Sequence, residues 1–177
     1  MSQKYQYPST KRLGSVLEST VTKSPIKIKI RRYRPGDMPQ VREIESSSLR
    51  FVTPVSLLSR FYEIIPEGFL VAEINGKIAG YIIGNMQNES EGHILAVTVD
   101  PKHRKHGIGT ALMKAICKVL KKQGANKMRV ELKLFNTGAK EFYSNMGFEE
   151  SNIIKGYYRM RGYTEDALIM TKNLGPL

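Results

Sequence analysis

The sequence predicts one domain of the α/β (α+β) class, in which helices cover a mixed β-sheet. Three observations lead to this class. Short stretches of alternating apolar and polar residues, typical of half-buried strands, recur along the chain. One strongly amphipathic helix interrupts them, and the dipeptide Asn75-Gly76 is typical of a two-residue hairpin turn. The expected element order is β-α-α-β-β-β-α-β-α-β-β, and a length of 177 residues fits a single domain.

The N-terminal half is expected to contain a tail, a strand, two short helices and a hairpin. Residues 1–25 are rich in Ser, Thr and Lys without sustained periodicity, which predicts a flexible basic tail before a folded domain at 26–177. Thr53-Pro54 resembles an N-cap followed by proline at the first helical position. In order, the expected elements are a strand at 26–30, a helix at 37–48, a helix from Thr53 to about Tyr62, and hairpin strands at 68–74 and 77–85.

The C-terminal half is expected to alternate strands and helices. An apolar stripe from Ile108 to Leu120, with lysines largely off it, predicts the longest helix. Gly124 stands where a helix C-cap belongs. The other expected elements are strands at 93–99 and 128–134, a helix at 137–145, and closing strands near 156–161 and 167–172.

Charge and composition limit the functional classes. Lysine and arginine number 28 against 16 aspartates and glutamates, a net charge of +12. Such a surplus attracts polyanions such as nucleic acid, the ribosome or a phosphate-rich cofactor, although a solvated lysine-rich surface explains it equally well. The single cysteine, Cys117, excludes an intrachain disulfide and a thiolate zinc cluster. No apolar run approaches the ~20 residues of a membrane span, so a cytoplasmic location is expected.

The most specific segment is the turn between the strand at 93–99 and the longest helix. Gly107 and Gly109 carry no Cβ and let the backbone approach a ligand closely. The unpaired N–H groups and the positive dipole end of the helix favour an anion, and Arg104 and Lys105 add full charges. The turn is therefore expected to bind phosphate, although its spacing fits neither the Rossmann nor the P-loop pattern.

The spacing of Arg104, Gly107 and Gly109 resembles the acetyl-CoA motif of the GCN5-related N-acetyltransferases, the GNAT family. A second segment, from Asn136 to Phe148, is similar to a later motif of the same family at every fixed position. The resemblance covers about residues 27–173. It implies a mixed sheet of about seven strands flanked by four helices, with a V-shaped splay between the fourth and fifth strands. It also implies acetyl-CoA as co-substrate, and no metal is expected.

The resemblance also implies a set of cofactor-binding residues. In the family, the six residues that correspond to Arg104–Gly109 wrap the CoA pyrophosphate through backbone N–H groups. The central strand meets the oxyanion with backbone N–H groups at a β-bulge, which is expected here at Val97–Val99. Asn136 either bonds the pantetheine or shapes its turn, and both alternatives remain open. The full set is Val97, Thr98, Val99, Arg104, Lys105, His106, Gly107, Ile108, Gly109, Thr110, Asn136 and Tyr143.

Two residues are expected to be catalytic. Glu131 stands where RimI-like members of the family carry a glutamate that acts as base. Its pKa should then be raised, or it should act through water. Alternatively, Glu131 is a surface residue paired with Lys133 or Arg129. Tyr143 matches the family's general acid, which protonates the departing thiolate. His93 is expected to be structural, to neighbour Glu131 as a proton relay, or to form half of a metal site.

Within the family, the sequence is most similar to enzymes that acetylate protein N-termini, namely the bacterial ribosomal-protein enzymes of the RimI kind and their archaeal and eukaryotic relatives. The similar segments lie at 92–94, 129–133 and 156–167. In those relatives, a hairpin with paired tyrosines and the loop between the first two helices clamp the peptide. Many of them carry a carboxylate in that loop, and Arg50 is present here instead, which suggests tolerance or some attraction to acidic peptides. The residues expected to contact a peptide are Phe51, Val52, Tyr157 and Tyr158, the last as the closer tyrosine.

Three functions remain open at this point. The first is transfer of an acetyl group from acetyl-CoA to the α-amino group of nascent or ribosomal proteins, by direct attack in a ternary complex. Ribosome association through the basic surface is compatible with it, whereas neither a membrane nor a specific nucleic acid is an expected partner. The second is acetylation of a small amine such as a polyamine, which the positive charge disfavours. The third is a ribosome- or RNA-binding module without turnover, which the presence of Glu131 and Tyr143 disfavours.

Overall fold

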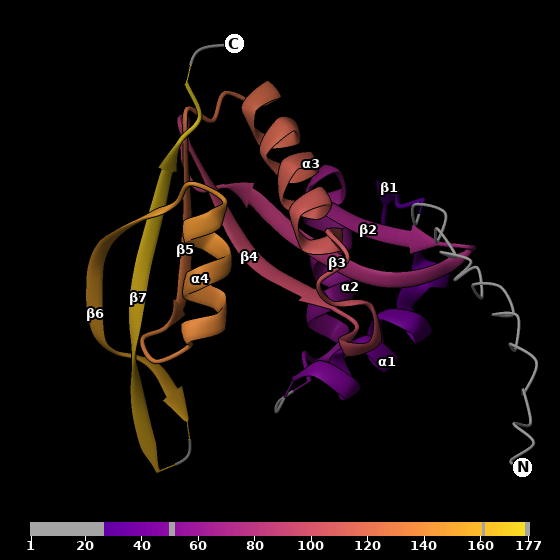
Figure 1. Ribbon diagram of the computed structural model, residues 1–177, viewed down its shortest axis with the longest axis horizontal. Helices are drawn as coiled ribbons and strands as arrows, with labels where there is room; N and C mark the ends of the chain where they lie inside the picture. The colour runs from indigo at the N-terminus through magenta and orange to yellow at the C-terminus, as the bar shows by residue number, and fades with distance from the viewer. Residues whose placement is uncertain (1–26, 50–51, 161, 176–177) are drawn as a thin grey trace, which may run out of the picture.

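The computed structural model describes residues 27–49, 52–160 and 162–175. The predicted tail at 1–25, the predicted contact Phe51 and the neighbouring Arg50 lie outside these ranges. The described residues form one seven-stranded sheet with helices on both faces (Figure 1). In chain order the elements are β1 (Lys29–Arg32), η1 (Pro35–Asp37), α1 (Met38–Ser48), α2 (Val55–Ile64), η2 (Pro66–Gly68), β2 (Phe69–Ile74), β3 (Lys77–Met86), β4 (Glu91–Val99), η3 (Pro101–His103), α3 (Ile108–Lys122), β5 (Lys127–Lys133), α4 (Thr137–Asn145), β6 (Glu149–Met160) and β7 (Tyr163–Asn173).

The sheet consists of two antiparallel parts joined by one parallel pair. Its strand order is β1-β2-β3-β4-β5-β7-β6, and the parallel pair is β4 with β5. That pair is short, because its register runs only from Glu91 opposite Lys127 to Ile94 opposite Val130. Beyond these positions β4 and β5 separate, as Figure 1 shows. The predicted mixed sheet, element order and splay between the fourth and fifth strands are confirmed.

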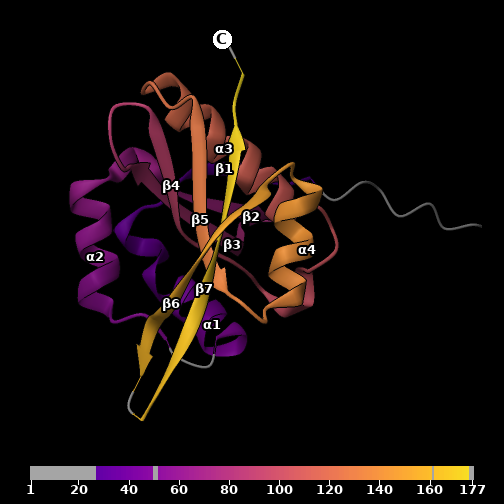
Figure 2. The same ribbon diagram turned by 90° about the vertical axis from the view of Figure 1, so that its left-hand side faces the viewer.

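Two apolar clusters hold the layers together on opposite faces of the sheet. On one face, α3 buries Ile108, Leu112, Ile116 and Leu120 at helical spacing against the strands. On the other face, α1 and α2 cover aromatic residues such as Phe69 and Tyr81. Figure 2 shows α2 and α4 on opposite sides of the sheet. Among the described residues, no helix combines the length and apolarity needed to cross a membrane.

Several local predictions are confirmed. Asn75 and Gly76 both have positive φ, 50° and 79°, as a type I′ turn requires. Helix α4 has the predicted bounds, and α3 begins at the expected Ile108. Gly124 follows the C-cap of α3 with a φ of +110°.

Other local predictions are wrong. Thr53 does not cap α2, because the N-cap position is Pro54 and no side-chain capping bond forms there. The first strand occupies Lys29–Arg32 rather than 26–30, because its backbone pairs with β2 from Lys29 as far as Arg32, which lies opposite Leu70. The closing strands are longer than predicted. Register shifts interrupt β6, so its sequence lacks the regular alternation by which a strand is recognised.

Candidate active site

The turn after β4 leads the chain into α3 through a short helical turn, η3. The Asp100 carboxylate accepts a hydrogen bond from the Lys102 amide at 3.0 Å and contacts His103 Nδ1 at 3.1 Å. Arg104 Nε donates to the Val99 carbonyl at 3.2 Å. His106 Nδ1 donates to the Arg104 carbonyl at 2.7 Å. These bonds fix the backbone of the turn while the Arg104 and His106 side chains remain exposed.

The N-terminus of α3 presents backbone donors at the end of this turn. Gly107 is its N-cap residue, with a φ of 79°, and Lys105 also has a positive φ of 60°. The Ala111 amide bonds the Gly107 carbonyl at 2.9 Å, so the N–H groups of Ile108, Gly109 and Thr110 precede the first helical bond. A Cβ on Gly107 would meet no atom within 4 Å, which leaves the approach to these groups open. The donors and the adjoining cations suit a phosphate group, as predicted.

Gly109 serves a second purpose that its sequence position did not indicate. A Cβ there would lie 3.1 Å from the ring of Phe142 on α4. The residue therefore lets α3 and α4 approach each other beside the opening between β4 and β5. Close helix packing, in addition to ligand access, explains a glycine at this position.

The β-bulge of β4 lies at a different position from the one predicted. Ile83 pairs with Ala96 and Gly84 pairs with Ile94, so Leu95 is the extra residue. From Ala96 to Val99 the register with β3 is regular, and the expected bulge at Val97–Val99 is wrong. Gly84 explains the site of the bulge, because a Cβ there would come within 3.0 Å of Ile116 on α3.

The end of β4 nevertheless turns two amides toward the opening. The Asp100 amide donates to the Ala79 carbonyl at 2.9 Å, which makes these two residues a hydrogen-bonded pair. Because such pairs alternate along antiparallel strands, Thr98 bonds to β3, while the Val97 and Val99 amides point toward the β5 side. There β5 has already separated from β4. Of the three residues predicted on this strand, Val97 and Val99 thus present N–H groups, and Thr98 does not.

Glu131 lies on β5 in a network of side-chain hydrogen bonds. Its Oε2 contacts His93 Nε2 across the parallel pair, and its Oε1 accepts from Arg129 Nε at 2.5 Å. His93 Nδ1 in turn faces Gln87 Oε1 at 3.1 Å. His93 is therefore a neighbour of Glu131, which was one of the alternatives predicted for His93. Glu131 is also paired with Arg129. Within the described ranges, no group of three or more metal-ligating side chains comes together.

The predicted rise in the pKa of Glu131 is wrong. Burial alone raises the pKa of this carboxyl, but the hydrogen bonds from His93 and Arg129 outweigh it and bring the pKa below its ordinary value. Gln87 is a partner that the sequence did not reveal, because it belongs to a polar loop whose path depends on the β3–β4 turn. Glu131 is therefore an ionised acceptor whose two oxygens both have partners.

Two tyrosines interact electrostatically with Glu131. Tyr143 on α4 is buried, with ring centroids 5.2 Å from Phe142 and 5.4 Å from Phe148. Burial, followed by the charges of Tyr158 and Glu131, raises the pKa of Tyr143. Burial likewise raises the pKa of Tyr158 to about 12, with smaller effects from Tyr157 and from Glu131. The three groups are thus close enough to influence one another.

The hairpin of β6 and β7 orients its two tyrosines differently. Tyr158 is half-buried, and Lys133 Nζ lies 6.0 Å from the centre of its ring. Tyr157 is 44% exposed and makes an edge contact with the Tyr158 ring. Neither tyrosine belongs to the core, which was the alternative for one of them. Glu131 affects the pKa of Tyr158, and the choice of Tyr158 as the closer peptide contact stays a prediction.

Asn136 shapes the start of α4. Its side-chain oxygen accepts a hydrogen bond from the Ala139 amide at 3.1 Å, as an N-cap does. The structure therefore bears out the turn-shaping alternative for this residue. Next to it, a pocket of about 420 Å³ lies between the end of β5 and the beginning of β7. Its walls include Lys133, Phe135 and Glu165.

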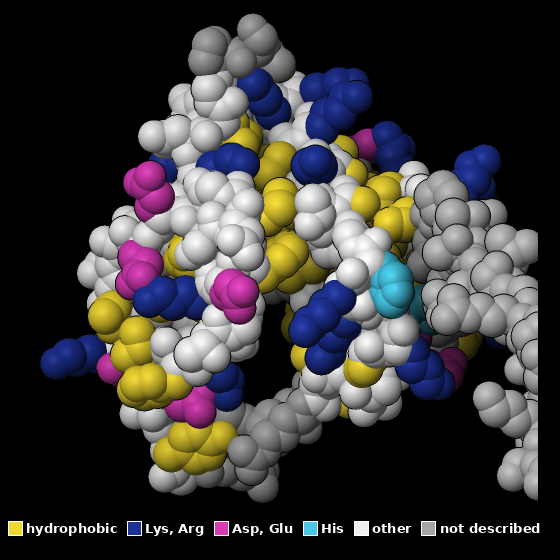
Figure 3. Space-filling view, in the orientation of Figure 1, with side chains coloured by type: hydrophobic (Ala, Val, Ile, Leu, Met, Phe, Trp, Pro, Cys, Tyr) yellow, Lys and Arg dark blue, Asp and Glu magenta, His cyan; other side chains and the backbone are white. Residues whose placement is uncertain are grey.

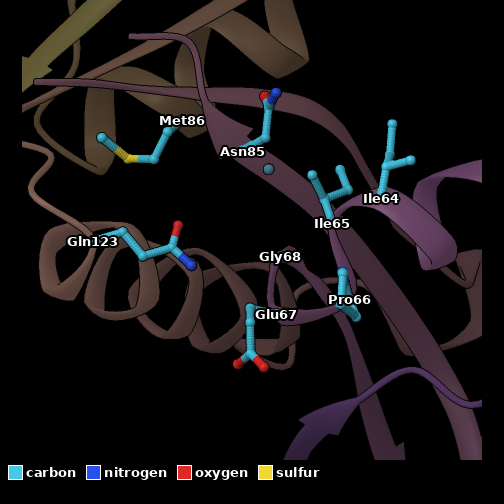
Figure 4. A pocket seen from close by; sticks show the side chains of 9 residues that line it. Ile64, Ile65, Pro66, Glu67, Gly68, Asn85, Met86 and Gln123 are labelled. Atoms are coloured by element: carbon cyan, nitrogen blue, oxygen red, sulfur yellow. The ribbon is translucent and has the colours of Figure 1, made fainter. Parts of the chain in front are cut away.

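The space-filling view shows how these groups surround an opening. A hollow separates the surface of α4 and β5–β7 from the surface of α3 and β4, and Lys or Arg side chains stand on its rim (Figure 3). A second, smaller pocket of about 270 Å³ lies elsewhere, between η2 and the end of β3 (Figure 4). Ile65, Asn85 and Gln123 line it, and none of the predicted site residues does.

Comparison with known proteins agrees with this geometry. Residues 38–148 match the model of the acetyltransferase (GNAT) family. An uncharacterized N-acetyltransferase of Methanocaldococcus jannaschii is 35% identical over 81% of this chain and 90% of its own length. The N-alpha-acetyltransferase of Sulfurisphaera tokodaii is 28% identical over 89% of this chain and its full length.

Two further matches complete the comparison. A putative ribosomal protein bS18-alanine N-acetyltransferase of Bacillus subtilis is 31% identical over 81% of this chain and 94% of its own length. The crystal structure of Ard1 from Thermoplasma volcanium superposes with a TM-score of 0.78. It is 28% identical and covers 84% of this chain and 99% of its own. The resemblance predicted from the two motifs is confirmed.

Proposed function

Because the chain belongs to the acetyltransferase (GNAT) family, we propose that it transfers the acetyl group of acetyl-CoA to the α-amino group at protein N-termini. One observation supports this proposal: β4 and β5 separate beyond a short parallel pair, Glu131 follows that pair on β5 and affects the pKa of Tyr143, and the helix that follows β4 begins with no side-chain cap. The names of the relatives from Sulfurisphaera tokodaii and Bacillus subtilis support the choice of substrate class.

The residues around the turn would hold acetyl-CoA. The amides of Ile108, Gly109 and Thr110 would bind its pyrophosphate, with Arg104 and Lys105 adding charge. When bound, acetyl-CoA supplies an acyl group activated as a thioester. The amides of Val97 and Val99 would donate to the thioester oxygen as negative charge develops on it.

Glu131 and Tyr143 would move the protons. An α-amino group has a pKa of about 7.7–8.0 and must lose a proton before it attacks. Glu131 is ionised, so it would attract the ammonium and accept its proton through water, while His93 Nε2 donates a hydrogen bond to its Oε2. As the new N–C bond forms and the C–S bond breaks, the Tyr143 hydroxyl would donate its proton to the sulfur, and the second proton that the nitrogen loses on becoming an amide would return to the tyrosinate through water. Its high pKa keeps that proton in place until a thiolate forms.

The face that carries Tyr158 would bind the peptide. Tyr158 and Tyr157 lie on the β6–β7 hairpin, and Val52 lies in the connection between α1 and α2. These elements would hold the first residues of an extended chain between them. Ribosome association through the basic surface stays a prediction from charge.

The test is an acetylation assay with the purified protein. Acetyl-CoA is offered with peptides that have a free N-terminus, with the same peptides blocked at the N-terminus but carrying lysine, and with spermidine. We expect mass spectrometry to locate the acetyl group on the α-amine of the free peptides. Acetylation confined to spermidine or to lysine side chains would contradict the proposal.

A further inference from the structure

A buried polar cluster lies beside the proposed site and has no part in the proton transfers. Among the described residues, three polar or charged ones are buried, namely Asp37, Glu45 and Thr98. Glu45 on α1 is 0% exposed, and Thr98 on β4 lies between the two amides that face the opening. Tyr81 on β3 is 1% exposed, and its hydroxyl interacts with the side chains of both Glu45 and Thr98.

Hydrogen bonds connect this cluster to four segments of the chain. The Tyr81 hydroxyl donates to Glu45 Oε1 at 2.7 Å. Arg42 Nη1 lies 3.3 Å from Glu45 Oε2 and also donates to the backbone carbonyl of Thr53. The side chains of Thr98 and Thr53 both interact with the Tyr81 phenol. The cluster therefore joins α1, β3, β4 and the segment that precedes α2.

A second contact joins two of these elements, α1 and β4. Ser48 Oγ, at the end of α1, donates to the Val99 carbonyl at 3.4 Å. Side-chain hydrogen bonds therefore hold the segment that precedes α2 near the end of β4. Local capping does not contribute, because α2 has no side-chain cap.

Stability alone does not explain such a cluster. Removing the Glu45 carboxylate from water is costly, and apolar residues of similar volume often stabilise a core at least as well. What a satisfied buried network supplies is one defined arrangement of the parts that it connects. Here the connected parts are the end of β4, which carries the Val97 and Val99 amides, and the segment at 52–54.

We propose that Arg42 is a positioning residue that holds the segment at 52–54 at a fixed distance from the end of β4, and so sets the width of the peptide entrance. Arg42 does this by donating to the Thr53 carbonyl while it is anchored on Glu45. The inference rests on the proposed function, because it assigns the entrance to a peptide. Arg42 touches none of the reacting atoms.

The test compares substitutions of Arg42 with the same substitution at a second arginine, Arg60. Arg42→Met removes the donor to Thr53, and Arg42→Lys retains one charged donor. Arg42→Met combined with Glu45→Gln removes both charges together and guards against unfolding by an uncompensated carboxylate. Arg60→Met on α2 is the control, because Arg60 is exposed. We expect Arg42→Met to raise the KM for peptide at least tenfold, with kcat and the KM for acetyl-CoA changed less than twofold. Arg42→Lys should restore part of the loss, and Arg60→Met should match the wild type.

Amide hydrogen exchange provides a readout that needs no substrate. We expect exchange in the segment around 52–58 to become at least tenfold faster in Arg42→Met and in the double variant, with β5 and β7 unchanged. Unchanged exchange there, or an equal loss of kcat for every substrate with a lower Tm, would overturn the inference. If the wild type fails to acetylate any peptide, the proposed function fails, and the exchange result still decides the role of Arg42.

Discussion

His93 on β4 and Glu131 on β5 form a hydrogen bond across the parallel pair, next to the point where the two strands separate. The contact links a carboxylate to an imidazole whose other nitrogen faces Gln87 at 3.1 Å. Arg129 occupies the second carboxylate oxygen at 2.5 Å. The proposed base is thus held in place on both sides and stays charged.

Replacement of Glu131 tests its role as proton acceptor. Glu131→Gln keeps the size of the side chain and removes its charge, so we expect kcat to fall by about 10² or more, within the usual range for acid–base groups. Affinity for acetyl-CoA should change less than twofold, because the proposed pyrophosphate contacts come from the turn before α3 and not from Glu131. Steady-state kinetics and calorimetric titration with CoA measure both quantities. Full activity of this variant would remove Glu131 from the mechanism.

The lowered pKa of Glu131 also predicts a pH dependence of stability. The carboxyl has a lower pKa in the folded protein than its ordinary value of 4.5, so its ionised form stabilises the fold. That contribution is complete above the unfolded-state pKa and disappears as the pH falls through the folded-state pKa. We expect the difference in Tm between the wild type and Glu131→Gln to shrink as the pH is lowered below about 4.5. A difference that is constant between pH 3 and pH 7 would contradict the ion pair with Arg129.

Replacement of Tyr143 separates proton donation from packing. Tyr143→Phe removes only the hydroxyl from a ring that already packs against Phe142 and Phe148. We expect Tm to stay within a few degrees of the wild type, whereas kcat falls by about 10² through the loss of the acid. Phe142→Leu is the control, because it disturbs the same cluster without touching the hydroxyl. A loss of turnover that is equal in both variants would indicate packing alone.

The tyrosine pair on the β6–β7 hairpin allows a matched comparison. Tyr158 is half-buried and electrostatically coupled to Glu131, whereas Tyr157 is 44% exposed. We expect Tyr158→Phe to raise the KM for peptide several-fold, because it loses a hydroxyl near the entrance. Tyr157→Phe should stay within twofold of the wild type. The reverse order of effects would show that the exposed tyrosine makes the contact.

The two glycines of the turn should fail in different ways. Gly107→Val forces a branched residue to a φ of +79°, which costs about 1–3 kcal/mol and distorts the anion site, so CoA affinity should fall at least tenfold. Gly109→Val crowds the Phe142 ring and should mainly lower Tm, as overpacking does. Gly138→Ala on α4, where a Cβ has free space, is the control. Equal CoA affinity in all three proteins would place the phosphate elsewhere.

Elements determined by local sequence were predictable. The amphipathic stripe of α3 and the Asn75-Gly76 turn depend on neighbouring residues, and the structure has both. The failure of Thr53 to cap α2 was not predictable, because its backbone carbonyl is held by Arg42 from another helix. The bulge at Leu95 likewise depends on Gly84 and on the packing of α3 against it.

The predictions for the candidate site divide in the same way, into features set by local sequence and features set by distant residues. The motifs identified the turn before α3 and Tyr143 without knowledge of the fold. The direction of the pKa shift at Glu131 depends on how near His93 lies, which the register of two strands sets. Arg129 was recognised as a candidate partner from its spacing, whereas Gln87 was not. The pKa of a residue depends on the side chains that the fold brings near it, and the pattern of a single strand does not show which these are.

Because the pairing between β4 and β5 is short, the sheet divides into two parts at this junction. Each side of it retains a complete antiparallel sheet of its own, β1–β4 on one side and β5–β7 on the other. The chain passes from one side to the other through the tight turn at Gly124, after α3 ends. A backbone cut at that turn would yield two fragments able to reassemble, and acetyl transfer would then report their recombination.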